Sequence, residues 1–122
     1  MEKTGPEINK VLPLTPTVFH ILLALADQER HGYGIMQEVM VMTQDRVRLG
    51  PGTLYGSIKR MLKANLIEES DERPDPELDD ERRRYYRLTS FGRQVLAAET
   101  QRLSTLIDVA QAKRVFGSGE VI

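Results

Sequence analysis

Residues 50–65 read GPGTLYGSIKRMLKAN, and this segment is the most informative part of the chain. Proline is favoured at the first position of a helix, where its missing N–H costs no hydrogen bond, so Pro51 marks a helix start. We predict that the helix runs to about Ala64 and that Asn65 is its left-handed C-cap. At about 100° per residue, one side of the helix carries four apolar residues that should face a core: Leu54, Ile58, Met61 and Leu62.

The opposite side of this helix combines glycine with basic residues. A glycine inside a helix costs about 1 kcal/mol relative to alanine, and an exposed position gains no packing from the missing side chain. Close approach of the helix backbone to another surface explains Gly56, and the basic residues around it indicate that this surface is anionic. We therefore predict that the helix enters the major groove of DNA through seven residues: Gly52, Thr53, Tyr55, Gly56, Lys59, Arg60 and Lys63.

Two plainer interpretations of this face stay open. Charged residues cover the outer side of most helices, so the basic residues alone also fit a solvated surface. The ring of Tyr55 can instead pack at the edge of the core with its hydroxyl in water. That packing is compatible with DNA contact, because the hydroxyl remains free to donate to a phosphate.

The segments around this helix predict the rest of the fold. Before it, we expect a helix capped by Thr15 that ends near Asp27, a second helix over about residues 33–43, and a short strand over 47–49. After it, strands over 66–70 and 83–88 enclose the acidic stretch 71–82, and a long helix capped by Thr89 runs to about residue 115. Alternation in the second strand turns Tyr86 and Leu88 inward, or the reverse set if the register slips.

Three helices followed by a two-stranded wing are typical of one DNA-binding architecture. We predict a mainly α fold with a small β-wing, that is, a winged helix-turn-helix plus a long C-terminal dimerisation helix. The expected organisation is a flexible N-terminal arm (1–13), a winged-helix DNA-binding domain (14–89), the dimerisation helix (90–116) and a tail (117–122). The last helix carries an apolar stripe, interrupted by Glu99, which should pack on a second subunit through Leu96, Leu103, Leu106, Ile107 and Ala110.

The formal net charge of −1 hides a strong segregation of charge. Residues 30–67 carry six basic and two acidic residues, whereas residues 68–81 carry nine acidic residues and one arginine. An acidic wing tip would be repelled by DNA, so we expect the tip to stay away from the duplex. The wing's contact with phosphates would then come from Arg82, Arg83 and Arg84, although a charged strand end without DNA contact is the alternative.

The sequence offers little to an enzyme. It contains no cysteine, which excludes disulfides and thiolate metal sites, and it holds none of the common hydrolase or metalloprotease motifs. Of the two histidines, His20 is expected at the edge of the core, and His31 is expected to orient the turn before the second helix by a hydrogen bond. We expect a cytoplasmic protein with no catalytic site, no metal and no cofactor, and we find no signal peptide or membrane span in the sequence.

Three motifs in register resemble the PadR family of bacterial winged-helix regulators. They are HGYGI at 31–35, PGTLY at 51–55 with KRML at 59–62 and LI at 66–67, and RRYYRLT at 83–89 followed by Gly92. The resemblance implies a homodimer that binds an inverted-repeat operator on double-stranded DNA, represses transcription, and is released by a small-molecule effector or another signal. The single C-terminal helix resembles the shorter subgroup of the family.

Two further points concern this resemblance. Family members with a drug-binding pocket place tryptophan between the dimer helices, and this chain has no tryptophan, so an aromatic drug site of that kind is not expected. The alternative function is a winged-helix protein–protein interaction module without DNA binding. Such a module would more often present apolar anchors on its exposed helix, where this chain presents glycine and lysine.

Overall fold

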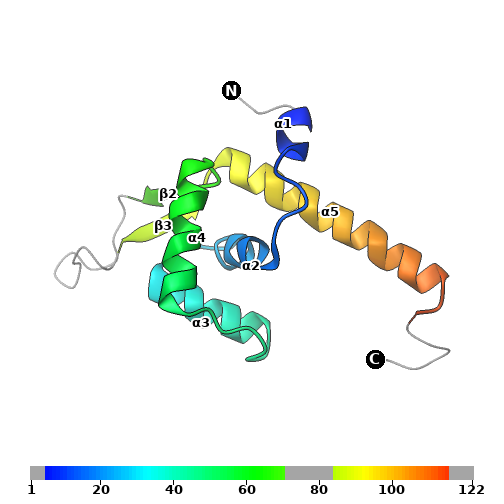
Figure 1. Cartoon of the computed structure of the whole chain (residues 1–122), viewed down its shortest axis with the longest axis horizontal. Helices are drawn as coiled ribbons and strands as arrows, with labels where there is room; N and C mark the ends of the chain where they lie inside the picture. Colours follow the sequence, from blue (N-terminus) through cyan, green and yellow to red (C-terminus); the bar gives the residue numbers. More distant parts are fainter. Residues whose placement is uncertain (1–4, 71–83, 116–122) are drawn as a thin grey trace.

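The computed structural model describes residues 5–70 and 84–115, which form a helical body with a small sheet and one projecting helix (Figure 1). This architecture confirms the predicted mainly α fold with a β-wing. In chain order the elements are α1 (Gly5–Asn9), α2 (Pro16–Ala24), β1 (Arg30–His31), α3 (Gly32–Met42), α4 (Pro51–Lys63), β2 (Ile67–Ser70), β3 (Tyr85–Leu88) and α5 (Ser90–Ala112).

Helix α4 begins and ends as its sequence predicts. Pro51 occupies the first turn after the N-cap Gly50. At the other end the C-cap is Ala64 rather than Asn65, and Asn65 follows it in the predicted left-handed conformation, with φ 61°. This turn lets the Leu66 amide donate to the Met61 carbonyl at 3.0 Å and sends the chain directly into β2. Leu54, Ile58 and Met61 are buried and Leu62 is partly buried, so the predicted apolar face does pack on the core.

The sheet joins segments far apart in the sequence. In the described part of the chain its order is β1-β3-β2, with antiparallel pairs throughout. Ile67 pairs with Leu88, and the buried residues of β3 are Tyr86 and Leu88, which settles the inward set of that strand.

Two strand predictions were wrong. Residues 47–49 form no strand, and the additional strand is Arg30–His31, in a segment expected to be a polar turn. A two-residue strand shows no alternation of its own, and it exists here because β3 offers a free edge to pair with.

Two other segments differ from expectation. Helix α2 ends at Ala24 rather than near Asp27. The backbone turns out of the helix at the C-cap Leu25, and the Arg30 Nε atom donates to the Ala24 carbonyl at 2.7 Å. The N-terminal arm was expected to be flexible over residues 1–13, but Gly5–Asn9 is helical and α1 packs against α5. Ile8 explains this packing, since its side chain lies against the hydrophobic core.

The start of α5 is locked to the junction of α4 and β2. The Thr89 hydroxyl accepts from the Gly92 amide at 2.8 Å and lies 2.6 Å from the Asn65 carbonyl, to which it can donate. A Cβ at Gly92 would overlap the Leu66 carbonyl oxygen, so only glycine permits this approach. From this anchor α5 runs past α2 and projects beyond the body (Figure 1). No helix within residues 5–70 and 84–115 has the length and apolar character that crossing a membrane requires.

Candidate nucleic-acid interface

The outer face of α4 is open. Gly52, Thr53, Lys59, Arg60 and Lys63 are exposed, and Gly56 is half-buried. Apart from the adjacent residues and the backbone of α4 itself, no described atom lies within 4 Å of a Cβ built on Gly52, and only the Arg60 Nη1 atom, at 3.6 Å, lies near one built on Gly56. Packing within the described chain therefore does not explain either glycine.

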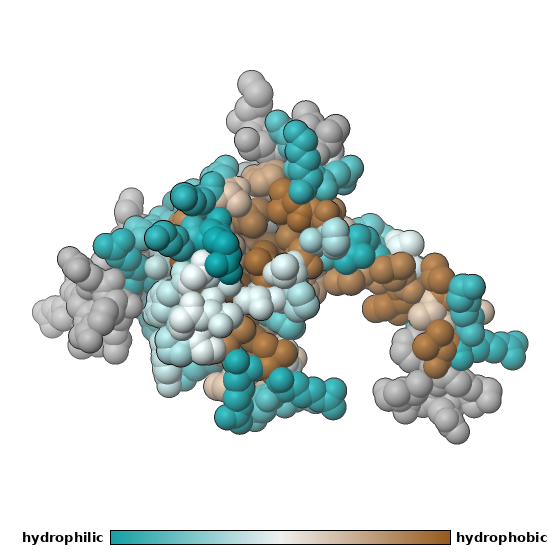
Figure 2. All heavy atoms as spheres, in the orientation of Figure 1, coloured by the Kyte–Doolittle hydropathy of each residue, from teal (hydrophilic) through white to brown (hydrophobic). Residues whose placement is uncertain are grey.

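The character of the surface changes along α4 (Figure 2). It is pale over the first turns, where the exposed glycine and threonine lie, and strongly hydrophilic over the later turns, where Lys59, Arg60 and Lys63 follow. The bare part of the helix is thus followed by a cationic part on the same face. Phosphates would be attracted to the second part while the helix backbone of the first part approaches base edges.

Tyr55 both packs against another helix and remains partly exposed on the outer face of α4. A Cβ on Gly32 would lie 2.7 Å from the Tyr55 Cζ atom, so the ring occupies the space that glycine leaves at the start of α3. The side chain is nevertheless 42% exposed. The ring therefore joins α4 to α3 while part of it remains at the surface.

The start of α3 also lies at this surface, and sequence reasoning missed one of its residues. Tyr33 is 60% exposed and directly follows the glycine on which Tyr55 packs. The predicted hydrogen bond of His31 is present and makes this residue the N-cap of α3, because its Nδ1 atom accepts from the Gly34 amide at 3.0 Å. The His31 ring also meets the Tyr85 ring edge to face, with centroids 5.2 Å apart, so the cap is held by the wing. An exposed aromatic directly after a helix cap was the available signal for Tyr33.

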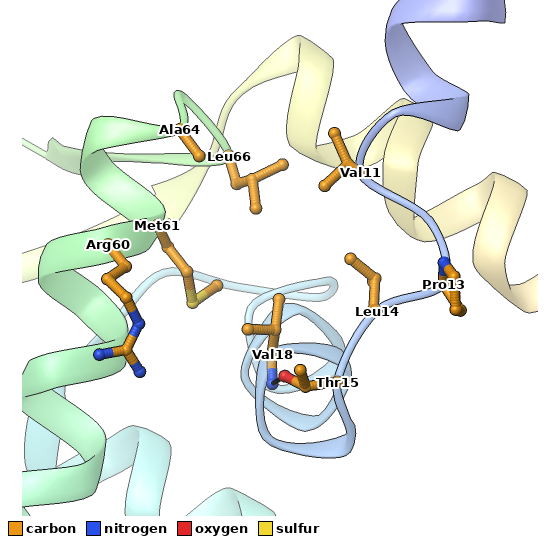
Figure 3. A pocket seen from close by; sticks show the side chains of 9 residues that line it. All are labelled: Val11, Pro13, Leu14, Thr15, Val18, Arg60, Met61, Ala64 and Leu66. Carbon is orange, nitrogen blue, oxygen red and sulfur yellow. Dashed lines mark hydrogen bonds between the residues drawn. The ribbon is translucent and has the colours of Figure 1, made fainter.

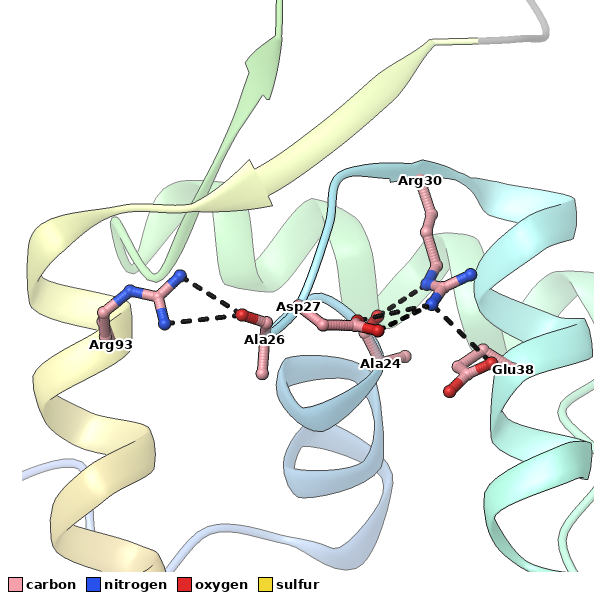
Figure 4. A network of polar contacts seen from close by, with 6 residues as sticks. All are labelled: Ala24, Ala26, Asp27, Arg30, Glu38 and Arg93. Atoms are coloured by element: carbon pink, nitrogen blue, oxygen red, sulfur yellow. Dashed lines mark hydrogen bonds and ion pairs between the residues drawn. The ribbon is translucent and has the colours of Figure 1, made fainter.

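Arg30 is basic, but its side chain makes contacts that stabilise the fold (Figure 4). Its Nη2 atom lies 3.3 Å from an Asp27 oxygen and 3.6 Å from a Glu38 oxygen, in addition to the bond from Nε to Ala24. From the other side, Arg93 on α5 donates to the Ala26 carbonyl at 3.5 Å. The turn after α2 is thereby held between α3 and α5, and the Arg30 charge is balanced by carboxylates.

The wing strands carry paired charges across β2 and β3. Arg84 lies 2.9 Å from Glu69 and Arg87 lies 2.7 Å from Glu68. Arg84 is exposed, but its charge is partly compensated by Glu69. Arg82, Arg83 and the acidic stretch 71–81 lie outside the described residues.

Beneath these charges, Tyr86 is buried at the centre of the sheet. Burial raises the pKa of its phenol, and the negative charge of Glu69 adds to the rise.

The apolar stripe of α5 divides into two parts. Leu96 is 7% exposed and belongs to the core of its own chain. Further along, Leu106 and Ile107 are 52% and 51% exposed, and Leu103 and Ala110 are partly buried. The second part is thus an apolar surface on the projecting segment of the helix, visible in brown in Figure 2.

Glu99, which interrupts the stripe, is buried for a reason that the sequence did not reveal. Its carboxylate accepts from the Leu14 amide at 3.0 Å and from Arg102 at 2.6 and 3.1 Å. The hydrogen bond from Arg102 holds the pKa of this carboxyl below its ordinary value, with the Leu14 amide acting in the same direction against the effect of burial. Glu99 therefore fastens the segment before α2 to α5. Of the described residues, no group of three or more acidic or histidine side chains could hold a metal ion.

Comparison with known proteins decides the family. The model of the transcriptional regulator PadR-like family matches residues 21–98, which include α3, α4, the wing and the first part of α5. The chain belongs to this family. The resemblance carried by the three motifs is confirmed, and the PadR-like chain is a transcriptional regulator rather than an enzyme, as predicted.

Two relatives match the PadR-like chain in sequence. It is 32% identical over 77 residues to protein X of Lysinibacillus sphaericus, covering 63% of this chain and 68% of that protein. It is 34% identical over 86 residues to a 37.1 kDa protein in transposon TN4556 of Streptomyces fradiae. That match covers 70% of this chain but only 22% of the larger protein.

Solved structures share the fold. A PadR family transcription regulator from Clostridium difficile is 27% identical with a TM-score of 0.64, covering 80% of this chain and 97% of that one. Bacillus subtilis PadR, solved in complex with operator DNA, is 21% identical with a TM-score of 0.58, covering 70% of this chain and 47% of that one. At that identity the second match supports the fold alone.

Proposed function

We propose that the protein is a dimeric repressor that binds an inverted repeat in double-stranded DNA through the outer face of α4. One observation carries the proposal. Gly52 and Gly56 stand on an open helix face without a packing partner in the described chain, next to Lys59, Arg60 and Lys63. A fold that only needed a stable helix would be better served by alanine at both positions.

Each part of α4 has a distinct task in this proposal. The glycines let the backbone approach the floor of the major groove, and the Thr53 and Tyr55 hydroxyls provide hydrogen bonds to base edges or phosphates. The three basic residues pair with phosphates and fix the register of the helix on the duplex. The wing adds Arg84, together with Arg82 and Arg83.

The exposed stripe of α5 supports the dimer. An apolar helix face that the described part of its own chain leaves open is best covered by the same face of a second copy, which forms a two-fold interface. Leu103, Leu106, Ile107 and Ala110 would make that contact, whereas Leu96 packs in the core of its own protomer. Two copies of α4 related by a two-fold axis match an inverted repeat, as in other helix-turn-helix dimers. A small-molecule effector would release this complex from DNA.

The test measures binding to the DNA upstream of the protein's own gene across a series of salt concentrations. If lysines and arginine neutralise phosphates, log K falls steeply as log salt rises, and Lys63→Ala makes the slope less steep by about one. Lys113→Ala at the C-cap of α5 is the matched control, because it removes the same charge far from α4 and should leave the slope unchanged. Binding that is insensitive to salt, or no binding to any promoter fragment, would favour the protein–protein module instead.

A further inference from the structure

A cavity of about 200 Å³ lies beside the C-terminal half of α4 (Figure 3). It is open to the surface and is bordered by the segment before α2, by the first turn of α2 and by the α4–β2 junction. Its wall is almost entirely aliphatic, formed mainly by Val11, Leu14, Val18, Met61, Ala64 and Leu66. An apolar cavity of about 150 Å³ is large enough for benzene, so this one has room for roughly six to eight carbon atoms. None of the described residues that line it carries an aromatic ring on which a planar ligand could stack.

The mouth of the cavity carries one positive charge. Of the described residues that line it, Arg60 alone is charged, and none of the carboxylates in the described part of the chain lies within 4.0 Å of its guanidinium. The Nη2 atom donates to the Ser57 hydroxyl at 3.2 Å, so the guanidinium lies along α4, toward Gly56, rather than in the cavity (Figure 3). An exposed guanidinium beside an aliphatic cavity is complementary to a molecule with an aliphatic tail and one carboxylate.

We propose that this cavity binds a small aliphatic carboxylate, with its tail against Leu14, Val18 and Met61 and its carboxylate on Arg60. The inference rests on the proposed function, because Arg60 also belongs to the face that contacts DNA. A bound carboxylate competes with phosphate for the same guanidinium and draws it away from Gly56 and Ser57. The ligand therefore lowers the affinity of the protein for DNA.

The cavity wall is also connected to the projecting helix. The Leu14 side chain lines the cavity, while the Leu14 amide donates to the buried Glu99 carboxylate of α5 at 3.0 Å. Met61 and Leu14 face each other across the cavity from α4 and from the segment tied to α5 (Figure 3). A ligand between them therefore contacts both α4 and the segment that Glu99 fastens to α5.

The first experiment measures ligand binding to the full-length protein without DNA, with octanoate as the probe and octanol as its uncharged counterpart. Arg60→Gln should weaken octanoate binding about three- to tenfold, as expected for one partly exposed ion pair with hydrogen bonds, and should leave octanol binding unchanged. Lys59→Gln is the matched control, since the same charge is lost from an exposed neighbour that does not line the cavity. Octanoate should shift the methyl NMR signals of Val18 and Met61.

A filling variant gives an independent check. Ala64→Phe places a ring at an exposed position in the cavity wall and should abolish binding of both probes, with circular dichroism to verify the fold. If that variant does not fold, the methyl shifts of the unmodified protein still locate the ligand. Absence of saturable octanoate binding, binding that Arg60→Gln does not weaken, or shifts confined to the stripe on α5 would each overturn the inference.

The second experiment separates the inference from the proposed function. Octanoate should weaken DNA binding by the unmodified protein and have little effect on DNA binding by Ala64→Phe. Octanoate binding at the cavity by a protein that never binds DNA would refute the proposed function and the regulatory part of the inference, but would support the site. DNA binding without any octanoate binding would refute the inference alone.

Discussion

Replacing Gly56 by alanine should stabilise the protein and weaken its binding to DNA. The added Cβ would meet only the Arg60 Nη1 atom, at 3.6 Å, which is ordinary van der Waals contact with the end of a flexible side chain. The fold therefore keeps the full gain in helix propensity, about 0.5–1 kcal/mol. For a chain of this size the melting temperature should rise by about 2–6 °C.

The same methyl group has the opposite effect on the complex. If the backbone at Gly56 lies against the duplex, the methyl group holds the helix away from the groove. We expect a loss of about tenfold in affinity, or about 1.4 kcal/mol, at constant salt. Fluorescence anisotropy with labelled promoter DNA measures this loss, and calorimetry of the free protein measures the change in stability.

Thr105→Ala is the control for this experiment. Thr105 is exposed on α5, almost opposite the apolar stripe, so the variant should also gain helix propensity while its DNA affinity stays unchanged. A Gly56→Ala variant that is more stable and binds DNA as tightly as the unmodified protein would refute the close-approach reasoning. If Gly52→Ala also leaves the affinity for DNA unchanged, the outer face of α4 is not the DNA-binding surface.

Three further predictions follow from the contacts that build the fold. Gly92→Ala should destabilise the protein by about 2 kcal/mol or more in urea unfolding, because the new Cβ overlaps the Leu66 carbonyl oxygen; full stability would mean that α5 can move at no cost. Since the pKa of Glu99 is lowered on folding, its contribution to stability is complete above its ordinary pKa of 4.5 and is lost as the pH falls through the lower value of the folded state. Urea unfolding at several pH values should therefore show a smaller loss of stability below pH 4.5 for Glu99→Gln than for the unmodified protein, and equal losses would contradict the assignment. Ile107→Glu should shift the protein from dimer to monomer in analytical ultracentrifugation without lowering its helix content, whereas a persistent dimer would exclude the stripe on α5 as the interface.

Much of the architecture was predictable because it depends on neighbouring residues. The first-turn proline of α4, the left-handed asparagine after its C-cap, the hydroxyl caps at Thr15 and Thr89, and the helical spacing of Leu54, Ile58 and Met61 all act within a few positions along the chain. The outer face of α4 was predictable for the same reason, since a helix of known period assigns every residue to a side. That the glycines lack partners elsewhere in the described chain became visible only in the structure.

The other features depend on residues distant in the sequence, and no local pattern encodes them. Arg30–His31 is a strand only because β3 lies beside it, and the buried Glu99 carboxylate accepts a hydrogen bond from Leu14, 85 positions away, as well as from the nearby Arg102. The candidate cavity likewise exists only where three segments meet. Helix period and capping depend on short-range geometry that a single segment already contains. Burial, pairing and cavities depend on which surfaces the folded chain brings together, so tertiary structure alone decided them.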